Sequence, residues 1–492
     1  MARMARAFVE AQVDPGRWAA RWLAYLLCLG LALATLPGCA QRAWNRPIKP
    51  VGVQDRYEFH TRLPKTNHDT FVVLAFSGGG TRAAAFSYGV LEKLRDTAVM
   101  VDGRRTRLLD QVDVITSVSG GSYTAAYYGL FGDRIFDDYR ARFLYQNWQG
   151  DLLKLLARPN HLLDISAPGY NRSDLVAAYL DRHLFDGKTF ADLSPEGLPM
   201  VIINASDLNN ATTFSFIQQQ FDFLCSDLSS YPVANAVMAS SAVPGPFAPL
   251  ALRNYPDCPQ RHQPWVTDSL AHDDLLTRRY AVARAIERYF DPQAMPVVRL
   301  VDGGVTDNLG VRGSMMSPVA QYGDVPNMAG AFTPDQLRRV RHVLVIVANA
   351  QTYHPFDWSI AGRAPGLRNT LQASFDASLG ILNTETVSLA RDGFLMWGQR
   401  VNAMRAAGEP RVDVNFAVLT FNQIRDVPTR DRFNAMPTTF HLKPAQVDEL
   451  RQLAGTLLDQ SPEFRHFVGE LTPLPDAAAS GAATSPRDHA LP

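Results

Sequence analysis

Short, uninterrupted runs of apolar residues recur through the middle of the chain, and most of them lack an alternation of polar and apolar positions. Turn residues bound these runs, which is typical of strands buried on both faces of a sheet. Helix-length segments separate them, for example residues 83–95 and 123–131. The pattern predicts a three-layer α/β/α sandwich with a mainly parallel central sheet, whose expected strands are Phe71–Phe76, Val112–Thr116, Met200–Asn204, Val297–Val301 and Val343–Val347.

The N-terminal segment follows a different pattern. Four arginines precede an apolar run over residues 22–36, and small residues and Cys39 follow it. This order is typical of a secretory signal, and the run is shorter than the roughly 20 apolar residues that a bilayer-spanning helix needs. The residues Leu36-Pro37-Gly38-Cys39 resemble the lipobox of bacterial lipoproteins. With Ala40 next, the resemblance implies an exported protein, lipidated at Cys39 and anchored in the outer membrane of a Gram-negative bacterium; a plain signal peptide is the alternative.

The rest of the chain divides by composition. Residues 132–195 and 250–292 interrupt the strand pattern as insertions, one helical and one rich in charge and proline. The polar stretch before about Thr70 has no sustained periodicity, and the residues after 472 are rich in Ala, Ser, Gly and Pro. The expected units are a signal peptide (1–38), a tether after the lipidated cysteine (39–70), the α/β domain (71–350), a helical extension packed on it (351–472) and a disordered tail (473–492).

Charge and histidine content argue against some classes of function. Lys plus Arg and Asp plus Glu are 48 each, so the formal net charge is zero. No global positive field would attract nucleic acid. The 11 histidines show no spacing typical of zinc ligands, so neither a metal site nor a cofactor is predicted.

Two cysteines would remain as free thiols in the mature chain. Processing at the predicted signal would remove Cys28 and modify Cys39, which leaves Cys225 and Cys258. Two cysteines in an oxidising compartment can pair. Either a disulfide between them or two buried, reduced thiols fits the sequence.

A glycine-rich loop, Ser77 to Arg82, follows the first predicted strand and leads into an alanine-rich segment. Three glycines allow a sharp turn and bring bare N–H groups close to a ligand, and the start of a helix favours negative charge. The loop therefore suits an anion or oxyanion. The residues from Gly78 to Ala83 also fit a dinucleotide fingerprint, with Asp102 as a ribose-binding acid, although export argues against a nucleotide cofactor. A tight turn with no ligand is a further alternative.

A cluster of serines and glycines follows the second predicted strand. A nucleophile elbow needs small residues two positions before and after its serine, because the strand-to-helix turn packs closely there. Of Ser117, Ser119 and Ser122, Ser119 fits best, since Gly121 follows it at the required spacing. Ser117 stands where the motif has glycine, and Ser-Gly clusters are also common in ordinary turns.

Asp302 is the candidate base for this serine. A serine hydroxyl is a poor nucleophile until a neighbouring group takes its proton. Asp302 ends a predicted strand and opens Asp302-Gly303-Gly304, at the carboxyl end of the strand where α/β sheets place their sites. An aspartate of ordinary pKa is a weak base, so this role requires partial desolvation. Asp-Gly is also a common turn.

These motifs together resemble the patatin-like phospholipase family over residues 71–350. The matching pieces, in family order, are the glycine loop with Arg82, the Ser119 elbow, Ala239–Pro244 with Phe247 and Pro249, and Asp302-Gly303-Gly304 followed by Asp307-Asn308; Asn204–Asp207 also looks like the family. The resemblance implies a Ser119–Asp302 dyad without histidine, an oxyanion hole formed by Gly78, Gly79 and Gly80, and supporting positions at Thr81, Arg82, Gly121, Gly303 and Gly304. Ala83 stands where the family usually has glycine.

The resemblance implies hydrolysis of fatty-acyl esters of phospholipids or lysophospholipids at a membrane surface, without a cofactor. Two other hypotheses stay open at this point. One is an α/β-hydrolase with a Ser-His-Asp triad, for which His342, His354 or His441 follows in the required chain order. The other is a lipoprotein that binds a lipid or a partner protein without catalysis.

Overall fold

The structure is a computed structural model of the 492-residue chain. It describes residues 43–48, 56–62, 69–158, 169–316, 319, 332, 334–353, 358, 362 and 364–472. The predicted signal peptide, Cys39 and the predicted tail from residue 473 lie outside these residues.

An eight-stranded sheet forms the centre of the molecule. Its order is β12 (Asp413–Thr420), β11 (His342–Asn349), β2 (Thr70–Phe76), β5 (Val112–Val118), β6 (Met200–Asp207), β10 (Val297–Asp302) and β9 (Leu250–Arg253), with β7 (Thr212–Ser215) also paired to β6. The strands from β12 to β6 are mutually parallel, whereas β10, β9 and β7 pair antiparallel. All five predicted strands are present, and the sheet is mixed but mostly parallel, as expected.

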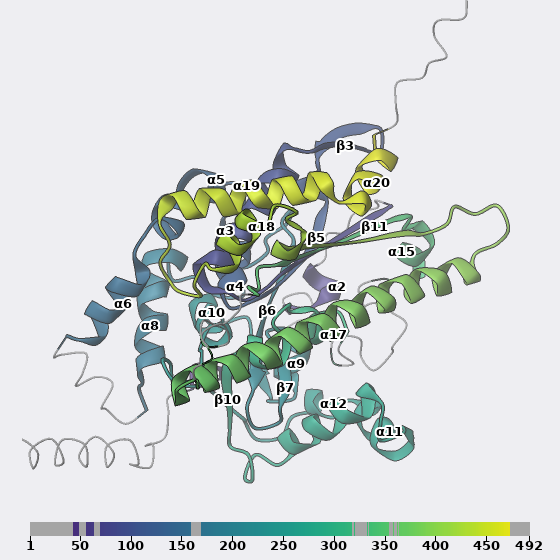
Figure 1. Cartoon of the computed structure of the whole chain (residues 1–492). Coiled ribbons are helices and arrows are strands. Elements are labelled where there is room, and N and C mark those ends of the chain that lie inside the picture. Colours follow the sequence, from purple (N-terminus) through teal and green to yellow (C-terminus); the bar gives the residue numbers. More distant parts are fainter. Residues whose placement is uncertain are drawn as a thin grey trace, which may run out of the picture.

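Helices cover both faces of the sheet, which makes the predicted three layers (Figure 1). On one face α3 (Gly80–Asp96) packs between α4 (Gly120–Phe131) and α19 (Pro444–Gln460). On the other face α17 (Leu367–Met404) crosses the sheet and packs against β12. Because both faces are covered, β2, β5 and β6 are buried along their whole length, which explains their continuous apolar runs.

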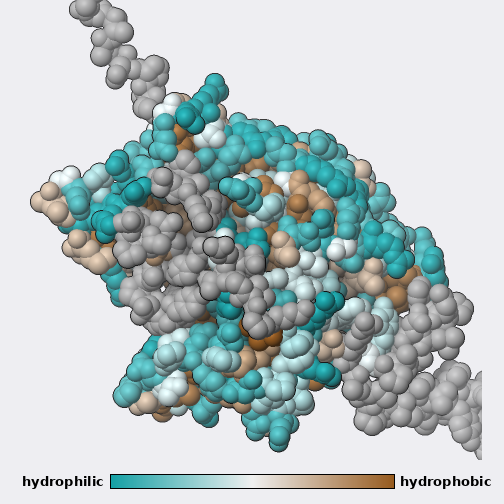
Figure 2. Space-filling model, turned by 180° about the vertical axis from the view of Figure 1, so that it is seen from behind, coloured by the Kyte–Doolittle hydropathy of each residue, from teal (hydrophilic) through white to brown (hydrophobic). Residues whose placement is uncertain are grey.

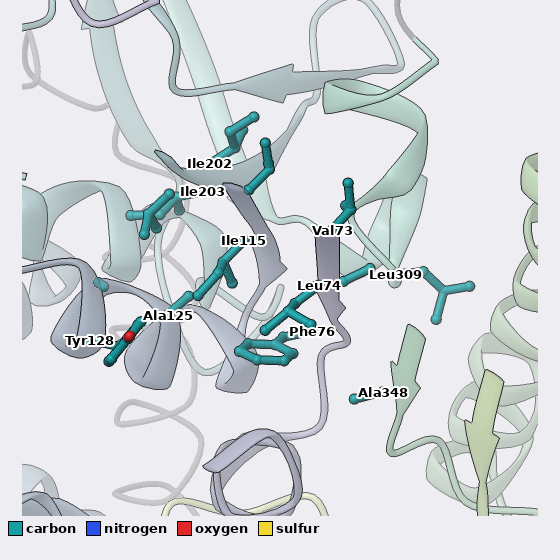
Figure 3. Close-up of a cluster of buried hydrophobic side chains, with 14 of the residues drawn as sticks. Val73, Leu74, Phe76, Ile115, Ala125, Tyr128, Ile202, Ile203, Leu309 and Ala348 are labelled. Carbon is teal, nitrogen blue, oxygen red and sulfur yellow. The ribbon is translucent and has the colours of Figure 1, made fainter. Parts of the chain in front are cut away.

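The core forms where strand side chains meet these helices (Figure 3). Leu74 and Ile115 point toward Ala125 of α4, while Val73 points to the opposite side of the sheet. All four side chains are at most 1% exposed. The parallel strands therefore contribute alternate residues to two apolar layers, and their carboxyl ends are fixed between them.

A bulge adjusts the register between β2 and β5. Val72 lies opposite Val112 and Val73 opposite Val114, so Asp113 is the extra residue. Its carboxylate accepts a 2.8 Å hydrogen bond from the Val72 N–H, which satisfies an amide that the bulge removes from the ladder. Burial raises the pKa of Asp113 to about 7.

The C-terminal extension is helical, as predicted, and also contributes a strand. Its helices include α17, α18 (Val427–Asn434), α19 and α20 (Pro462–Glu470). The sequence analysis did not predict β12, which extends the sheet beyond β11 in parallel register. As an edge strand, β12 is only partly buried at several positions, so it lacks the continuous apolar run of a central strand.

The two predicted insertions contain most of the remaining helices. In residues 132–195 these are α5 (Arg134–Tyr139), α6 (Trp148–Leu156) and α8 (Arg172–Leu180), with π-helical turns at Arg140–Leu144 and Asp181–Phe185. In residues 250–292 they are α11 (Pro264–His272) and α12 (Arg278–Glu287), preceded by β9 at the edge of the sheet. Shorter elements are β3 (Ala98–Val101), β4 (Arg104–Arg107), α9 (Gln218–Asp222), β8 (Ser226–Asp227), α10 (Val233–Ser240), α13 (Gly304–Asp307), α14 (Val311–Ser314) and α15 (Pro334–Arg339), with 3₁₀ turns at Leu108–Gln111, Pro259–Arg261, Arg288–Phe290 and Phe421–Gln423.

Two parts of the predicted tether pack on the domain, so the expectation that order begins near Thr70 is wrong. β1 (Arg46–Pro47) pairs antiparallel with β8, and α2 (Phe59–Arg62) follows farther along the chain. Tyr57 is fully buried, and its hydroxyl donates a 2.7 Å hydrogen bond to the Val201 carbonyl. Single aromatic residues hold these short pieces, and such anchors leave no periodic pattern in the sequence.

The surface opposite to the view of Figure 1 carries mostly hydrophilic side chains, with smaller hydrophobic areas between them (Figure 2). Within the described part of the chain, no helix is both long and apolar enough to cross a bilayer.

Candidate active site

The turn between β5 and α4 holds Ser119 in a strained backbone conformation. Its φ of 48° and ψ of −120° lie where residues other than glycine are rarely found. Strain of this kind costs about 1–3 kcal/mol and persists only where the surroundings enforce it. Here the Ser119 N–H donates a 2.8 Å hydrogen bond to Ser240 Oγ, which in turn donates to the Asn204 carbonyl. The result is the sharp strand-to-helix turn of a nucleophile elbow.

Close packing explains the two glycines after Ser119. A Cβ on Gly120 would lie 2.1 Å from the Gly80 carbonyl oxygen. A Cβ on Gly121 would lie 2.7 Å from Phe76 Cβ. The elbow is thus pressed against the glycine loop and the end of β2, which brings those two predicted motifs together.

The other two serines of the cluster are internal to the turn. Ser117 and Ser122 are fully buried, and Ser122 Oγ donates a 3.1 Å hydrogen bond to Ser117 Oγ. Ser117 Oγ donates to the Ile202 carbonyl at 3.2 Å. A serine at the glycine position of the motif is therefore accommodated by a hydrogen bond to β6. Of the three candidates, only Ser119 is bonded to Asp302.

Asp302 meets Ser119 at the end of β10. Ser119 Oγ donates a 2.8 Å hydrogen bond to Asp302 Oδ2, and the Gly304 N–H donates to Oδ1, also at 2.8 Å. Both residues are 7% exposed, so the pair lies below the surface but is still reachable. A Cβ on Gly303 would lie 2.4 Å from the Asn204 carbonyl oxygen, so the turn after Asp302 also requires glycine.

Strand direction brings the two residues together in a way the sequence analysis did not foresee. Asp302 ends β10, as expected, and β10 runs antiparallel to β6. Asp302 lies opposite Ala205, while Val118 of the parallel β5 lies opposite Asn204. Since Asn204 and Ala205 are consecutive, the ends of β5 and β10 reach the same point of β6 from opposite directions.

Burial changes the acidity of Asp302. Desolvation raises its pKa from 3.8 to about 6, and the hydrogen bonds from Gly304 and Ser119 offset part of this rise. A carboxylate with a raised pKa is a stronger base than an exposed aspartate. The desolvation that the proposed role requires is therefore present.

The glycine loop lies beside Ser119. Gly79 and Gly80 have φ values of 139° and 60°, which only glycine adopts without strain. A Cβ on Gly78 would lie 3.3 Å from Ser119 Cβ. The Gly78 N–H donates to the Asn308 carbonyl at 3.0 Å, whereas the N–H groups of Gly79 and Gly80 have no hydrogen-bond acceptor among the described residues. In this arrangement two of the three predicted donors are available.

Comparison with known proteins adds to this geometry. Residues 74–314 match the family model described as patatin-like phospholipase, and this range contains the loop, Ser119 and Asp302. Residues 74–314 form a patatin-like phospholipase domain.

Three solved structures show the range of structural similarity. Human GIVD cytosolic phospholipase A2 is 14% identical, with 81% of this chain and 62% of that chain covered and a TM-score of 0.36. The same human protein in complex with methyl gamma-linolenyl fluorophosphonate is 12% identical, with 82% and 60% covered and a TM-score of 0.33. VipD from Legionella pneumophila is 12% identical, with 91% and 77% covered and a TM-score of 0.27. The chain spans less than two thirds of the human protein's chain. No curated protein matches.

Arg82 holds the glycine loop of the patatin-like domain against the C-terminal extension. Its guanidinium donates to the Ala350 carbonyl at 2.8 Å, to the Met436 carbonyl at 2.5 Å and to Thr438 Oγ1 at 3.0 Å. The adjacent Thr81 N–H donates to the Thr439 carbonyl at 2.9 Å. Burial lowers the pKa of Arg82 to about 10, and the charge of Asp376 partly offsets this. Arg82 therefore holds the loop through hydrogen bonds to neutral acceptors, two carbonyls and a threonine hydroxyl.

The sequence analysis missed the segment Met436–Phe440, which supplies these contacts. The Phe440 ring lies 6.0 Å from that of Tyr123 and 6.1 Å from that of Phe247. Burial raises the pKa of the Tyr123 phenol, and the charge of the nearby Asp302 carboxylate adds to this rise. An apolar aromatic group therefore lies next to the dyad, and only Phe247 carried a sequence signal, through the family motif.

Among the described residues, no histidine is bonded to the dyad. His342 begins β11 opposite Thr70, at the amino end of β2, about 20 Å along the strands from the glycine loop. His441 is near the loop, yet within the described residues no hydrogen bond joins a histidine to Ser119 or Asp302. His354 lies outside the described residues.

Asp102 does not lie where the dinucleotide hypothesis requires a ribose-binding acid. It lies in the turn between β3 and β4, an antiparallel hairpin, with φ values of 51° for Asp102 and 72° for Gly103. A ribose-binding acid belongs at the end of a parallel strand next to β2. The loop fits a dinucleotide fingerprint in sequence only.

Cys225 and Cys258 form a disulfide, which links the segment before β8 to the insertion 250–292. Disulfides of this kind are typical of exported proteins. No group of three or more His, Cys, Asp or Glu side chains that could hold a metal ion occurs in the part of the chain that the structure describes.

Proposed function

We propose that this protein is a serine acyl hydrolase that releases fatty acids from phospholipids and lysophospholipids. The observation that carries the proposal is the 2.8 Å hydrogen bond from Ser119 Oγ to the buried carboxylate of Asp302. A strained elbow presents the hydroxyl, and a base with a pKa of about 6 is in contact with it. This combination supplies a nucleophile and its base without a histidine.

Acyl transfer follows from this arrangement in two steps. Asp302 takes the proton of Ser119 as Oγ bonds to the ester carbonyl carbon, and the oxyanion forms beside the N–H groups of Gly79 and Gly80. The tetrahedral intermediate collapses, and the leaving alcohol takes the proton from Asp302. Water then gives its proton to Asp302 and attacks the acyl-enzyme, which frees the fatty acid and returns the proton to Ser119.

The surroundings of the dyad favour an apolar acyl chain. Next to the dyad, the ring of Phe440 packs against those of Tyr123 and Phe247. Burial of each methylene against such a surface contributes about 0.8 kcal/mol, so a long acyl chain binds far more tightly than a short one. The patatin-like domain supports a lipid ester as the substrate class.

Release of fatty acid from defined lipids tests the proposal. Vesicles of phosphatidylcholine and micelles of lysophosphatidylcholine are incubated with the wild-type protein and with Ser119→Ala. We expect release by the wild type and none above background by Ser119→Ala, because no other hydroxyl of the described residues bonds to Asp302. Covalent labelling by a fluorophosphonate should likewise require Ser119.

Two results would contradict the proposal. Equal release by both proteins would place the chemistry elsewhere. No release and no fluorophosphonate labelling of a folded wild type would favour a binding protein without turnover. Circular dichroism of both proteins establishes that they are folded.

The pH dependence should report the pKa of Asp302. The carboxylate must be ionised to accept the proton, and burial raises its pKa from 3.8 to about 6. We therefore expect kcat/KM on a soluble short-chain ester to rise about tenfold per pH unit below pH 6 and to level off above it. A value of kcat/KM that stays constant down to about pH 4.5 would show that Asp302 is not the titrating base.

A further inference from the structure

A cavity of about 170 Å³ lies outside the proposed active site, where α12, β7 and the turn from α13 to α14 meet. Neither Ser119 nor Asp302 lines it, and the described residues that do include no carboxylate. Its polar lining consists of Thr212, Thr213, Gln220, Arg278, Tyr289, Thr306 and Arg312.

The polar side chains that line this cavity carry hydrogen-bond donors that have no acceptor among the described residues. Arg312 donates from Nε to Thr386 Oγ1 at 2.6 Å, while its two terminal nitrogens have no partner in the described residues. Arg278 has one long hydrogen bond, 3.4 Å, to the Met316 carbonyl. Gln220 is 6% exposed, and its amide has no hydrogen bond to any described residue. Arg278 is exposed and Arg312 half-buried, so their unpaired N–H groups at the cavity are open to solvent and available to a ligand that accepts hydrogen bonds.

The charges at the cavity point to the same kind of ligand. Burial lowers the pKa of Arg278, and the positive charge of Arg312 lowers it further, which places the two guanidinium groups near each other. Two acids lie nearby, and both are already bonded. Asp307 accepts from four backbone amides between residues 309 and 313 at 2.6–3.3 Å, and Asp207 accepts from the Tyr289 hydroxyl at 2.5 Å. Neither arginine forms an ion pair within the described residues.

We propose that this cavity binds a phosphate-class oxyanion. Guanidinium groups present paired N–H donors that match phosphate oxygens, and the threonine hydroxyls and the Gln220 amide add further donors. The volume is several times the roughly 30 Å³ share of one water, enough for a phosphate group but not for a long acyl chain. The anion is either the headgroup phosphate of a phospholipid, which rests on the proposed function, or free phosphate.

The position of the cavity links it to the dyad. Thr306 belongs to α13, the four-residue helix whose first amide, Gly304, donates to Asp302. Thr306 Oγ1 also lies 2.8 Å from Ser206 Oγ of β6. An anion bonded to Thr306 therefore contacts the same short helix that orients the proposed base.

Thermal unfolding in inorganic phosphate tests binding without any enzyme assay. The full-length wild type, Arg278→Gln/Arg312→Gln and Arg284→Gln are titrated with sodium phosphate against sodium chloride at equal ionic strength. Arg284 is a matched control, because it lies on α12 and is exposed like Arg278, but it pairs with Glu287 and does not line the cavity. We expect a saturable rise in Tm for the wild type and the control, and more than roughly tenfold weaker phosphate affinity for the double variant.

The same three proteins distinguish the two sources of phosphate. Hydrolysis of phosphatidylcholine is compared with that of diacylglycerol with the same acyl chains in mixed micelles. If the cavity takes the headgroup, the double variant raises KM for phosphatidylcholine more than roughly tenfold relative to KM for diacylglycerol. An unchanged KM ratio together with a lost phosphate titration supports free phosphate as the ligand.

Equal phosphate titrations for all three proteins together with an unchanged KM ratio would overturn the proposal. Absence of hydrolysis by the wild type would contradict the proposed function, yet the phosphate titration would still decide whether the cavity binds an anion. If the double variant does not fold, Arg278→Gln alone serves, because Arg278 lies exposed at the start of α12 and loses only the long bond to Met316.

Discussion

Replacement of Asp302 by asparagine is expected to lower kcat about 10²–10⁴-fold, the usual contribution of a general base. Asparagine preserves the size of the side chain and can keep one hydrogen bond to Ser119, but it cannot take the proton of the hydroxyl. KM should change little, because Asp302 acts on the reacting hydroxyl and does not line an acyl-binding surface. The measurement is kcat and KM on lysophosphatidylcholine micelles, with Tm as the measure of folding.

Asp113→Asn is the matched control. Asp113 is another buried aspartate with a pKa raised by burial, to about 7, and it lies at the other end of β5, bonded to the Val72 N–H. Its replacement removes a buried carboxylate without touching the dyad, so activity should stay within a few-fold of the wild type. A similar loss in both variants would mean that Asp302 acts through folding. A loss of the same size in His441→Ala would instead favour a triad.

The central strands could be predicted from local sequence because burial on both faces requires a run of apolar residues. Residues 71–76 are all apolar, and residues 112–118 are mostly apolar and buried at every position, since helices cover each face. The Ser119 elbow was predictable for a similar reason, because close contacts with the glycine loop and the end of β2 exclude larger residues at Gly120 and Gly121. Both features depend on the burial and close packing of a few consecutive residues, which restrict the residue types at those positions.

Features that depend on distant partners could not be predicted in the same way. The direction of β10 is decided by its pairing with β6, and its apolar run would suit either direction. The segment Met436–Phe440 holds Arg82 mainly through backbone carbonyls, which every residue possesses, across more than 350 positions. The donors of the cavity proposed to bind phosphate come from five separate elements, β7, α9, α12, α13 and α14, and none of them belongs to a motif.

Gly80→Ala is expected to lower turnover about 10²–10³-fold, the usual effect of losing one oxyanion donor. The φ of Gly80 is 60°, and an added Cβ would lie 2.4 Å from the Thr439 carbonyl oxygen. Backbone cannot yield as a flexible side chain does, so the loop must shift away from the C-terminal segment. That shift displaces the Gly80 N–H, which has no other partner among the described residues and is one of the two proposed oxyanion donors.

Gly103→Ala separates this effect from backbone strain alone. Gly103 has a similar φ of 72° in the β3–β4 hairpin, but an added Cβ there meets nothing within 4 Å. Both alanines carry the cost of a left-handed backbone, about 1 kcal/mol, so both should lower Tm slightly. Only Gly80→Ala should also lower kcat. Equal kcat in the two variants would show that the glycine loop supports the fold without stabilising the oxyanion, and the N–H of Ser119 or Gly120 would then have to be tested as the donor.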